Sequence, residues 1–151
     1  MMTIRTIRRA QEAEREAIET CVRRAYACYL ARMEREPAPL HADYLSLIKD
    51  GTVYVLPTTE GICGVLVMMP ERDAMFVENV AIDPRFQGQG LGRLLFSFVE
   101  QEALKAGLKA IRLYTNAVMV ENFRFYRRLG FEEVDRRLHE GYQRVFFQKL
   151  L

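Results

Sequence analysis

The chain has 151 residues; half of them are apolar and 28% are charged, values typical of a soluble globular protein of about one domain. They exclude a wholly disordered chain and a small protein held together by disulfides. The 22 basic and 20 acidic side chains leave a net charge of +2. A net charge this small creates only a weak long-range electric field. We therefore expect no nucleic-acid or membrane partner, because such partners are attracted by a strongly basic surface. Any bound anion must be held by a local feature, and we expect one domain over residues 1–151.

Chemically important residue types are scarce. Three cysteines without a CxxC pair match neither a disulfide framework nor a zinc site, and we expect buried free thiols. The two histidines, His41 and His139, have no neighbour at metal-ligand spacing, so no metal is expected. Ser97 lacks the flanking glycines of a hydrolase nucleophile. With no signal peptide and no long apolar run, the protein is expected to be cytoplasmic.

The first third of the chain is expected to be mainly helical. Alternating apolar and polar residues predict a first strand over Thr3–Arg8. From Ala10 to about Arg35 the Ala, Glu, Arg and Leu content predicts one long helix or two helices with a short break. The prolines at 37 and 39 end it, because a residue before proline is driven out of the helical region. A short helix over Ala42–Lys49 follows, with Gly51 as its stop.

The remaining elements alternate between strands and helices. Three apolar segments separated by turns at Pro57–Gly61 and Pro70–Asp73 predict an antiparallel meander of Thr52–Leu56, Ile62–Met69 and Met75–Ile82. A glycine-rich stretch then opens a helix that runs to about Lys105. The strand after it should lie parallel to the last meander strand. The elements from there on are Ala110–Thr115, the helix Met119–Leu129, and a hairpin of Phe131–Leu138 with Tyr142–Leu150.

The most informative segment joins the third meander strand to the following helix. Its sequence over residues 80–93 is Val-Ala-Ile-Asp-Pro-Arg-Phe-Gln-Gly-Gln-Gly-Leu-Gly-Arg. Glycines let the backbone approach a ligand, and free amides at a helix start bind phosphate. A P-loop would need Lys and Ser or Thr, and a dinucleotide fingerprint would need glycine where Arg93 stands. The pattern that does fit is Gln-x-x-Gly-x-Gly, through Gln87, Gly90 and Gly92.

This pattern resembles the acetyl-CoA-binding signature of the GNAT N-acetyltransferase superfamily. Glu78–Pro84 looks like the family's fourth strand, and the residues from Asn116 to Phe131 look like its second CoA-side motif. The resemblance covers nearly the whole chain, and Arg23–Ile48 is similar to a subgroup of bacterial GNAT proteins. It implies an α/β (α+β) GNAT fold: a mixed, mostly antiparallel sheet of six to seven strands with helices on both faces and a splay between strands 4 and 5.

The resemblance also implies acetyl-CoA as co-substrate. Backbone groups of Val80 and Ile82 are then expected to hold the pantetheine arm, and those from Gln87 to Arg93 the pyrophosphate. An amide near Val80 would point at the thioester carbonyl and stabilise its developing charge. The expected cofactor-binding residues are Val80, Ala81, Ile82, Gln87, Gly88, Gln89, Gly90, Leu91, Gly92, Arg93, Asn116, Asn122 and Tyr126. Asn116 has a second interpretation, as a cap of the following helix.

Two residues are candidates for acid–base chemistry. An amine with a pKa of about 10.4 must lose a proton before it attacks a thioester, and Glu78 is the expected base, acting through water. Its apolar strand should desolvate the carboxylate and raise its pKa. The alternative is a structural glutamate that is hydrogen-bonded or faces solvent. Tyr126 is the expected acid for the CoA thiolate, and its alternative is a core tyrosine.

The sequence thus predicts direct transfer of an acetyl group to a primary amine in a ternary complex, without metal. The competing hypothesis is a catalytically silent CoA-binding sensor or interaction module. Tyr26, Tyr29 and Tyr44 are candidate substrate contacts for a small cationic amine, and a peptide amine is the other substrate class. The C-terminal hairpin could pair two copies as a homodimer, and a monomer is the alternative.

Overall fold

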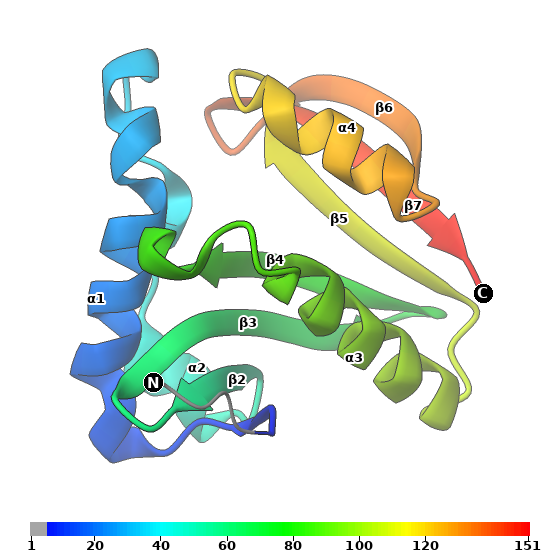
Figure 1. Ribbon diagram of the computed structural model, residues 1–151. Coiled ribbons are helices and arrows are strands. Elements are labelled where there is room, and N and C mark those ends of the chain that lie inside the picture. Colours follow the sequence, from blue (N-terminus) through cyan, green and yellow to red (C-terminus); the bar gives the residue numbers. More distant parts are fainter. Residues whose placement is uncertain (1–5) are drawn as a thin grey trace. The chain divides into compact units, whose positions relative to one another are not determined.

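The computed structural model describes residues 6–151, and these form a mixed sheet with helices packed on it. Its seven strands lie in the order β1-β2-β3-β4-β5-β7-β6 (Figure 1). Strand β4 is parallel to β5, and the β1–β2, β2–β3, β5–β7 and β6–β7 pairs are antiparallel. The strands are β1 Arg8–Arg9, β2 Val53–Thr58, β3 Gly61–Glu71, β4 Ala74–Ile82, β5 Ala110–Asn116, β6 Glu132–His139 and β7 Tyr142–Leu150. The expected mixed, mostly antiparallel sheet is confirmed.

Helical elements alternate with the strands as expected, but the first is shorter than the sequence suggested. The α-helices are α1 Arg15–Tyr26, α2 Tyr44–Lys49, α3 Leu91–Lys105 and α4 Val120–Arg128. The 3₁₀ turns are η1 Glu12–Glu14, η2 Ala27–Arg32, η3 Ala38–His41 and η4 Pro84–Phe86. After Tyr26 the chain tightens into η2, which has no buried residue. Without packing to support it, a helix loses most of its stabilisation, so the α-helix ends there.

The chain divides into two compact units. Of the described residues, the first unit comprises 6–68 together with Asn79–Phe98, and the second comprises Met69–Glu78 and Val99–Leu151. The first unit therefore holds β1, β2, most of β3, the end of β4, α1, α2 and the start of α3. The second holds the end of β3, the start of β4, the end of α3, β5, α4, β6 and β7. The expectation of one domain over 1–151 stays a prediction.

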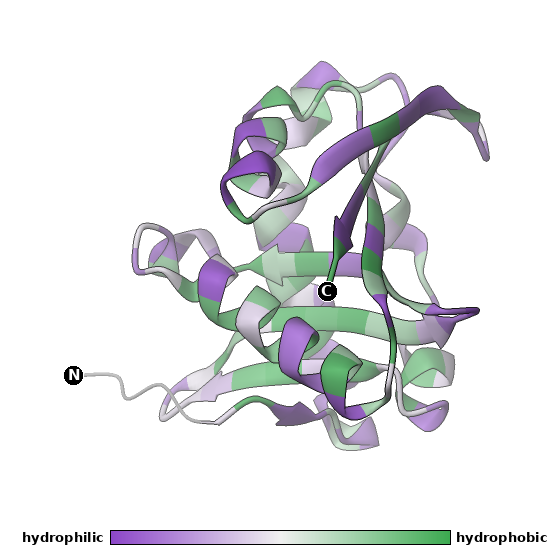
Figure 2. Cartoon of the chain, turned by 90° about the vertical axis from the view of Figure 1, so that its right-hand side faces the viewer, coloured by the Kyte–Doolittle hydropathy of each residue, from purple (hydrophilic) through white to green (hydrophobic). Residues whose placement is uncertain are grey.

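Strand β3 is the centre of the first unit's core. Residues 63–68 are all buried, so both faces of the strand are covered. The start of α3 lies on one face and α2 on the other (Figure 1). The horizontal strands β2, β3 and β4 are accordingly mostly green in Figure 2. Gly64 permits the close approach of α3: a Cβ there would lie 3.2 Å from Leu56 Cβ and 3.5 Å from Leu95 Cδ1.

Helix α4 covers one face of the sheet in the second unit. The rings of Phe123 and Tyr126 lie 6.0 and 5.5 Å from that of Phe147. Successive residues of a strand point to opposite faces, so the neighbouring pair Tyr114 and Phe146 lies on the other face. Those two rings are 5.6 Å apart. The second unit therefore has an aliphatic and aromatic core under α4 and an aromatic row on its opposite face.

The expected splay between β4 and β5 is present. The parallel pairing extends from Ala74–Ala110 to Val77–Leu113 and ends there. Both strands continue beyond it, β4 to Ile82 and β5 to Asn116. The last residues of β4 therefore have no backbone partner in β5.

Several local expectations differ from the structure. Thr3–Arg8 lies partly outside the described residues, and the described strand is Arg8–Arg9. Pro57 and Pro70 lie inside β2 and β3, not in turns. Pro57 is tolerated because the β2–β3 register shifts between Leu56 and Pro57, where a missing amide costs little. The three cysteines are free, but Cys28 is exposed because η2 buries nothing.

No helix within residues 6–151 combines the length and apolar character needed to span a bilayer. Over the same residues, no three His, Cys, Asp or Glu side chains are grouped so that they could hold a metal ion.

Candidate functional site

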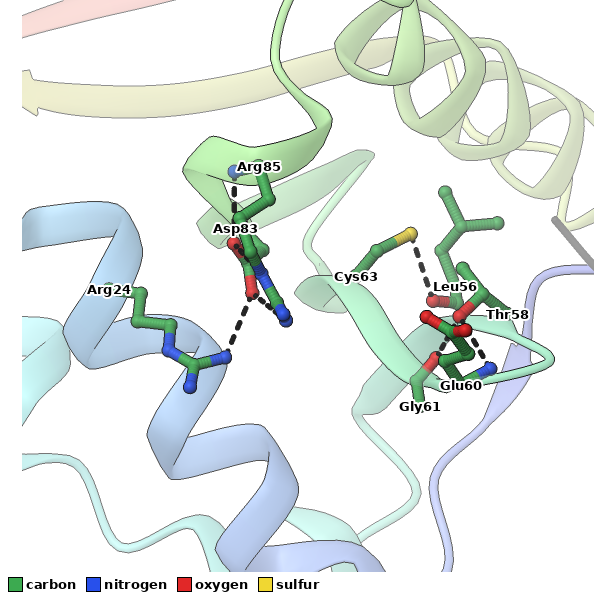
Figure 3. Close-up of polar contacts among 8 residues, drawn as sticks. All are labelled: Arg24, Leu56, Thr58, Glu60, Gly61, Cys63, Asp83 and Arg85. Carbon is green, nitrogen blue, oxygen red and sulfur yellow. Dashed lines mark hydrogen bonds and ion pairs between the residues drawn. The ribbon is translucent and has the colours of Figure 1, made fainter. Parts of the chain in front are cut away.

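The end of β4 is fixed by a buried carboxylate. Asp83 is 1% exposed, and its amide donates to the carbonyl of Cys63 at 2.9 Å. Its Oδ1 accepts from the Arg85 amide at 3.0 Å, and its Oδ2 accepts from Arg85 Nη2 at 2.9 Å and Arg24 Nη1 at 3.3 Å. Figure 3 shows the carboxylate of Asp83 between the two guanidinium groups. The point where the chain leaves the sheet is therefore tied to both β3 and α1.

These partners keep Asp83 ionised. Burial alone raises the pKa of its carboxyl, but the hydrogen bonds from Arg85 and Arg24 outweigh burial and hold that pKa below its ordinary value. The neighbouring Cys21 thiol behaves oppositely: burial, with the charge of Asp83 and the nearby Cys63, raises its pKa to about 12. Cys21 therefore stays protonated at neutral pH and is a core residue, not a nucleophile.

The loop after Asp83 has a backbone that requires glycine. Gly88 and Gly90 have φ values of 82° and 77°, in the left-handed region that other residues occupy only with strain. No atom lies within 4 Å of a Cβ built on either residue. Residues 87–90 are all exposed, and the buried Leu91 anchors the start of α3. The loop thus presents bare backbone to solvent.

The start of α3 supplies amide donors next to this bare backbone. Its first hydrogen bond is from the Leu94 amide to the Gly90 carbonyl, at 3.1 Å. The amides of Leu91, Gly92 and Arg93 precede that bond and have no acceptor within the helix. A helix start of this kind, with its partial positive charge, suits an anion, and binding of an anion here stays a prediction. These residues fit the linked phosphates that the sequence pattern predicted.

The remaining expected cofactor residues of the first unit lie in β4. Val80 and Ile82 are half-buried and Ala81 is buried, all beyond the last β4–β5 backbone pair. Their contact with a pantetheine arm stays a prediction.

Glu78 lies on β4 with its side chain exposed. Its pKa is nevertheless raised above the ordinary value, first because neighbouring atoms displace part of its water and second because of the negative charge of Glu140. Arg144 acts in the opposite direction. The raised pKa agrees with the expectation, whereas full enclosure in apolar surroundings is absent.

Sequence reasoning missed the hairpin residues that act on Glu78. Arg144 is 5% exposed, and its Nη1 donates to Glu140 Oε1 at 2.8 Å and to His139 Nδ1 at 2.7 Å. Its guanidinium carbon lies 4.0 Å from the centre of the Tyr114 ring. The available signal was an arginine directly before the apolar residues Val145–Phe147 of β7, three residues after Gly141. A buried cation thus holds a carboxylate close to the candidate base.

Tyr126 lies on α4 with a half-buried side chain. Its ring is 5.5 Å from that of Phe147, 5.6 Å from Phe125 and 6.0 Å from Phe131. These aromatic neighbours agree with the alternative interpretation, in which Tyr126 is a packing residue of the core. Its role as a general acid stays a prediction.

The two asparagines of the second motif organise the turn before α4. Asn116 Oδ1 accepts from the Val118 amide at 3.0 Å, and Asn122 Nδ2 donates to Thr115 Oγ1 at 3.3 Å. The helix N-cap is Met119, not Asn116. Asn116 therefore supports the entry to the helix from within the turn, and its contact with a pantetheine arm stays a prediction.

Two of the three candidate substrate tyrosines, Tyr26 and Tyr44, form hydrogen bonds with a residue that the sequence did not single out, Asn79. Tyr26 Oη donates to Asn79 Oδ1 at 2.6 Å, and Asn79 Nδ2 donates to Tyr44 Oη at 3.3 Å. Tyr44 is buried, whereas Tyr26 and Tyr29 are half-buried with their ring centres 6.0 Å apart. Tyr29 also lies 4.7 Å from the guanidinium carbon of Arg32.

The expected site residues thus fall into two sets. The three tyrosines, residues 80–82 and the loop 87–93 belong to the first unit. Glu78, Asn116, Asn122 and Tyr126 belong to the second.

Comparison with known proteins points to one family. Residues 49–133, more than half of the chain, match the family described as acetyltransferase (GNAT) domain. An uncharacterised N-acetyltransferase of Methanocaldococcus jannaschii is 30% identical over 71 residues, which are 47% of this chain and 31% of the relative. The match therefore spans less than a third of that curated protein.

Solved structures share the fold over nearly the full length. The PaiA N-acetyltransferase of Thermoplasma acidophilum, solved in complex with coenzyme A, superposes with a TM-score of 0.80 at 15% identity and covers 99% of both chains. Ard1 of Thermoplasma volcanium has a TM-score of 0.74 at 20% identity and covers 97% of both chains.

The Asp83 anchor leads to a stability prediction. Asp83→Asn should lower the free energy of unfolding at pH 7 by about 1–2 kcal/mol, because two charge-assisted hydrogen bonds are lost. The folded-state pKa of Asp83 is below that of the unfolded chain, about 3.9. The stabilisation is therefore present above that pH and is lost as the pH falls through the folded-state value.

Urea unfolding of both proteins between pH 7 and pH 3 should show the difference shrinking towards acid. Asp73→Asn is the control, because Asp73 is exposed and pairs with the half-exposed Arg112 at 3.1 Å. It should change stability by less than about 0.5 kcal/mol. Equal losses for the two variants would contradict the anchoring role.

Proposed function

The chain belongs to the acetyltransferase (GNAT) domain family, and on this basis we propose that it transfers an acetyl group from acetyl-CoA to a primary amine. The observation that carries the proposal is the exposed, left-handed backbone at Gly88 and Gly90 directly before the free amides of α3. A neutral protein with this feature can bind a pyrophosphate without a basic surface.

Acetyl-CoA supplies the activated acetyl group as a thioester, and the first unit would hold it. The amides between Gln87 and Arg93 bind the phosphates, and the backbone of Val80, Ala81 and Ile82 binds the pantetheine arm. An amide near Val80 donates to the thioester oxygen as negative charge develops there. Asn116, Asn122 and Tyr126 are the proposed cofactor contacts of the second unit.

Glu78 is the proposed general base, and Tyr126 the proposed general acid. Through a water molecule, Glu78 takes the proton that an amine must lose before attack. Its raised pKa brings the carboxylate closer to the neutral range in which a base is effective. Tyr126 then donates its hydroxyl proton to the departing thiolate, which gives the free thiol of CoA, and the tyrosine regains a proton from solvent; the ordinary pKa values of the phenol and the thiol, about 10 and about 8.5, make this transfer only slightly uphill.

The amine acceptor is proposed to contact the segment around Tyr26, Tyr29 and Tyr44. Either a small-molecule amine or a peptide amine carries the cationic group that Glu78 would meet. A second copy of the chain, paired through the C-terminal hairpin, is proposed as the partner in a homodimer. Strand β6 ends the sheet and exposes Val134 and Leu138, which are 57% and 63% accessible.

The alternative proposal is a CoA-binding module without turnover. Both functions need the glycine loop, whereas only catalysis needs Glu78 and Tyr126, so their presence favours the enzyme. Release of free thiol from acetyl-CoA should be measured with a panel of small amines and peptides. Amine-dependent release is expected, and CoA binding without turnover across the panel would favour the module.

The role of the glycine loop can be tested by placing a side chain at two glycines that both have a positive φ, one in the loop and one outside it. Gly90→Ala should weaken CoA binding at least about tenfold in calorimetry, because a side chain in the left-handed region costs roughly 1–2 kcal/mol and the loop relaxes away from its binding shape. Gly107→Ala is the matched control: its φ is 73°, and it also has no atom within 4 Å of a built Cβ. It should lose similar stability and keep CoA affinity. If both variants bind CoA equally well, the loop is not the phosphate site.

The role of Glu78 predicts a pH dependence. Glu78→Gln should lower kcat by about 10²–10⁴ at neutral pH. In the unmodified protein, activity should fall with decreasing pH at a pKa above the ordinary glutamate value of about 4.3. Glu140→Gln removes a charge that raises the pKa of Glu78, so its acid limb should move to lower pH. Glu132→Gln, exposed on β6, is the control. Full activity of Glu78→Gln would exclude this base.

A further inference from the structure

The buried side chain of Asn79 binds two tyrosine hydroxyls at once. Asn79 is 6% exposed; its Oδ1 accepts from Tyr26 Oη at 2.6 Å, and its Nδ2 donates to Tyr44 Oη at 3.3 Å. The hydroxyl of Tyr44 in turn donates a hydrogen bond to the Pro39 carbonyl at 2.6 Å. The result is a continuous hydrogen-bonded chain from strand β4 to the end of α1 and to the start of α2.

The residue type at position 79 suits this network. A carboxamide carries an acceptor and a donor on one short side chain. The hydroxyl proton of Tyr44 is donated to the Pro39 carbonyl, so the Tyr44 oxygen is available as an acceptor, and the nitrogen of Asn79 donates to it. The oxygen is then left for Tyr26. Leucine has a similar size but could satisfy neither tyrosine.

Most of the segment between the two tyrosines is exposed or half-buried, and Pro37 is the one buried residue between positions 27 and 43. The turns η2 and η3, which make up much of residues 27–43, contain no buried residue. Leu30, a large apolar side chain, is 45% exposed. A segment with few buried contacts opens at low free-energy cost, so its average position depends on where its ends are held. Tyr26 and Tyr44 directly flank it.

We propose that Asn79 is a positioning residue that sets the acceptor-binding segment 27–43 against strand β4. This inference rests on the proposed function, in which that segment contacts the amine. Tyr26 and Tyr44 then act through Asn79 as anchors of the segment, and Tyr29, which lies between them in the sequence, is the member of the trio that faces the acceptor.

The effect expected from breaking the network is selective. Asn79→Leu should raise the KM for the amine about tenfold, because the segment spends less time in its binding position. The KM for acetyl-CoA should stay within about twofold, since the glycine loop is held separately by Asp83. Amide hydrogen exchange over residues 27–43 should become about tenfold faster.

The experiment measures hydrogen exchange by mass spectrometry and both KM values for Asn79→Leu, Tyr26→Phe and the double variant. The double variant should show no more than the larger single effect, because both changes remove the same hydrogen bond. Thr58→Val is the matched control: Thr58 is 7% exposed, and its hydroxyl donates to the Gly61 carbonyl at 2.8 Å. Thr58→Val removes this hydrogen bond and the one that the same hydroxyl accepts from the Glu60 amide at 3.1 Å, and it should leave exchange over 27–43 and the amine KM unchanged.

The outcomes separate this inference from the proposed function. Faster exchange over 27–43 together with a selective rise in the amine KM supports both. Faster exchange in a protein that acetylates no amine overturns the proposed function and keeps Asn79 as the anchor of the segment. Exchange and amine KM equal to those of Thr58→Val overturn the inference. Should Asn79→Leu fail to fold, Tyr26→Phe, which keeps its ring, carries the same test.

Discussion

The arrangement of the first unit depends on how the end of β4 is held by buried polar groups. Asp83 places an ionised carboxylate between Arg24 and Arg85, and four residues earlier Asn79 binds Tyr26. Arg24 and Tyr26 both belong to the last turn of α1. Strand and helix are therefore joined by directional contacts, which fix rotation and register more narrowly than apolar packing does. The strand end needs this precision because its backbone is the proposed contact surface for acetyl-CoA.

The same fixation explains how a nearly neutral protein can hold an anion. The carboxylate of Asp83 engages the two arginines and orients the turn η4, so the chain enters the glycine loop in one direction. The backbone N–H groups at the start of α3 then follow the loop, and they have no acceptor within the helix. In the proposed phosphate site, the orientation of the backbone dipoles supplies the binding free energy, and a net positive charge is not required.

In the second unit, the proposed base is governed by the β6–β7 hairpin. The turn at Glu140-Gly141 has two residues with positive φ, which suits the twist of a two-residue hairpin. It places Glu140 where the buried Arg144 can bind it, and both charges act on Glu78 in opposite directions. The pKa of Glu78 therefore depends on both Glu140 and Arg144, and a change of either residue should shift it.

The sequence by itself determined the order of the elements, the glycine loop and the family, because periodicity, helix stops and left-handed glycines are local properties of the chain. It also located Glu78 and the tyrosines as candidates. Only the tertiary structure decided their surroundings: Asp83 meets Arg24 across 59 positions, and Asn79 meets Tyr26 across 53. Which side chains meet over such separations depends on strand register and helix placement, so no local pattern encodes it. For the same reason, the exposure of Glu78 and the strand positions of Pro57 and Pro70 could not be predicted from neighbouring residues alone.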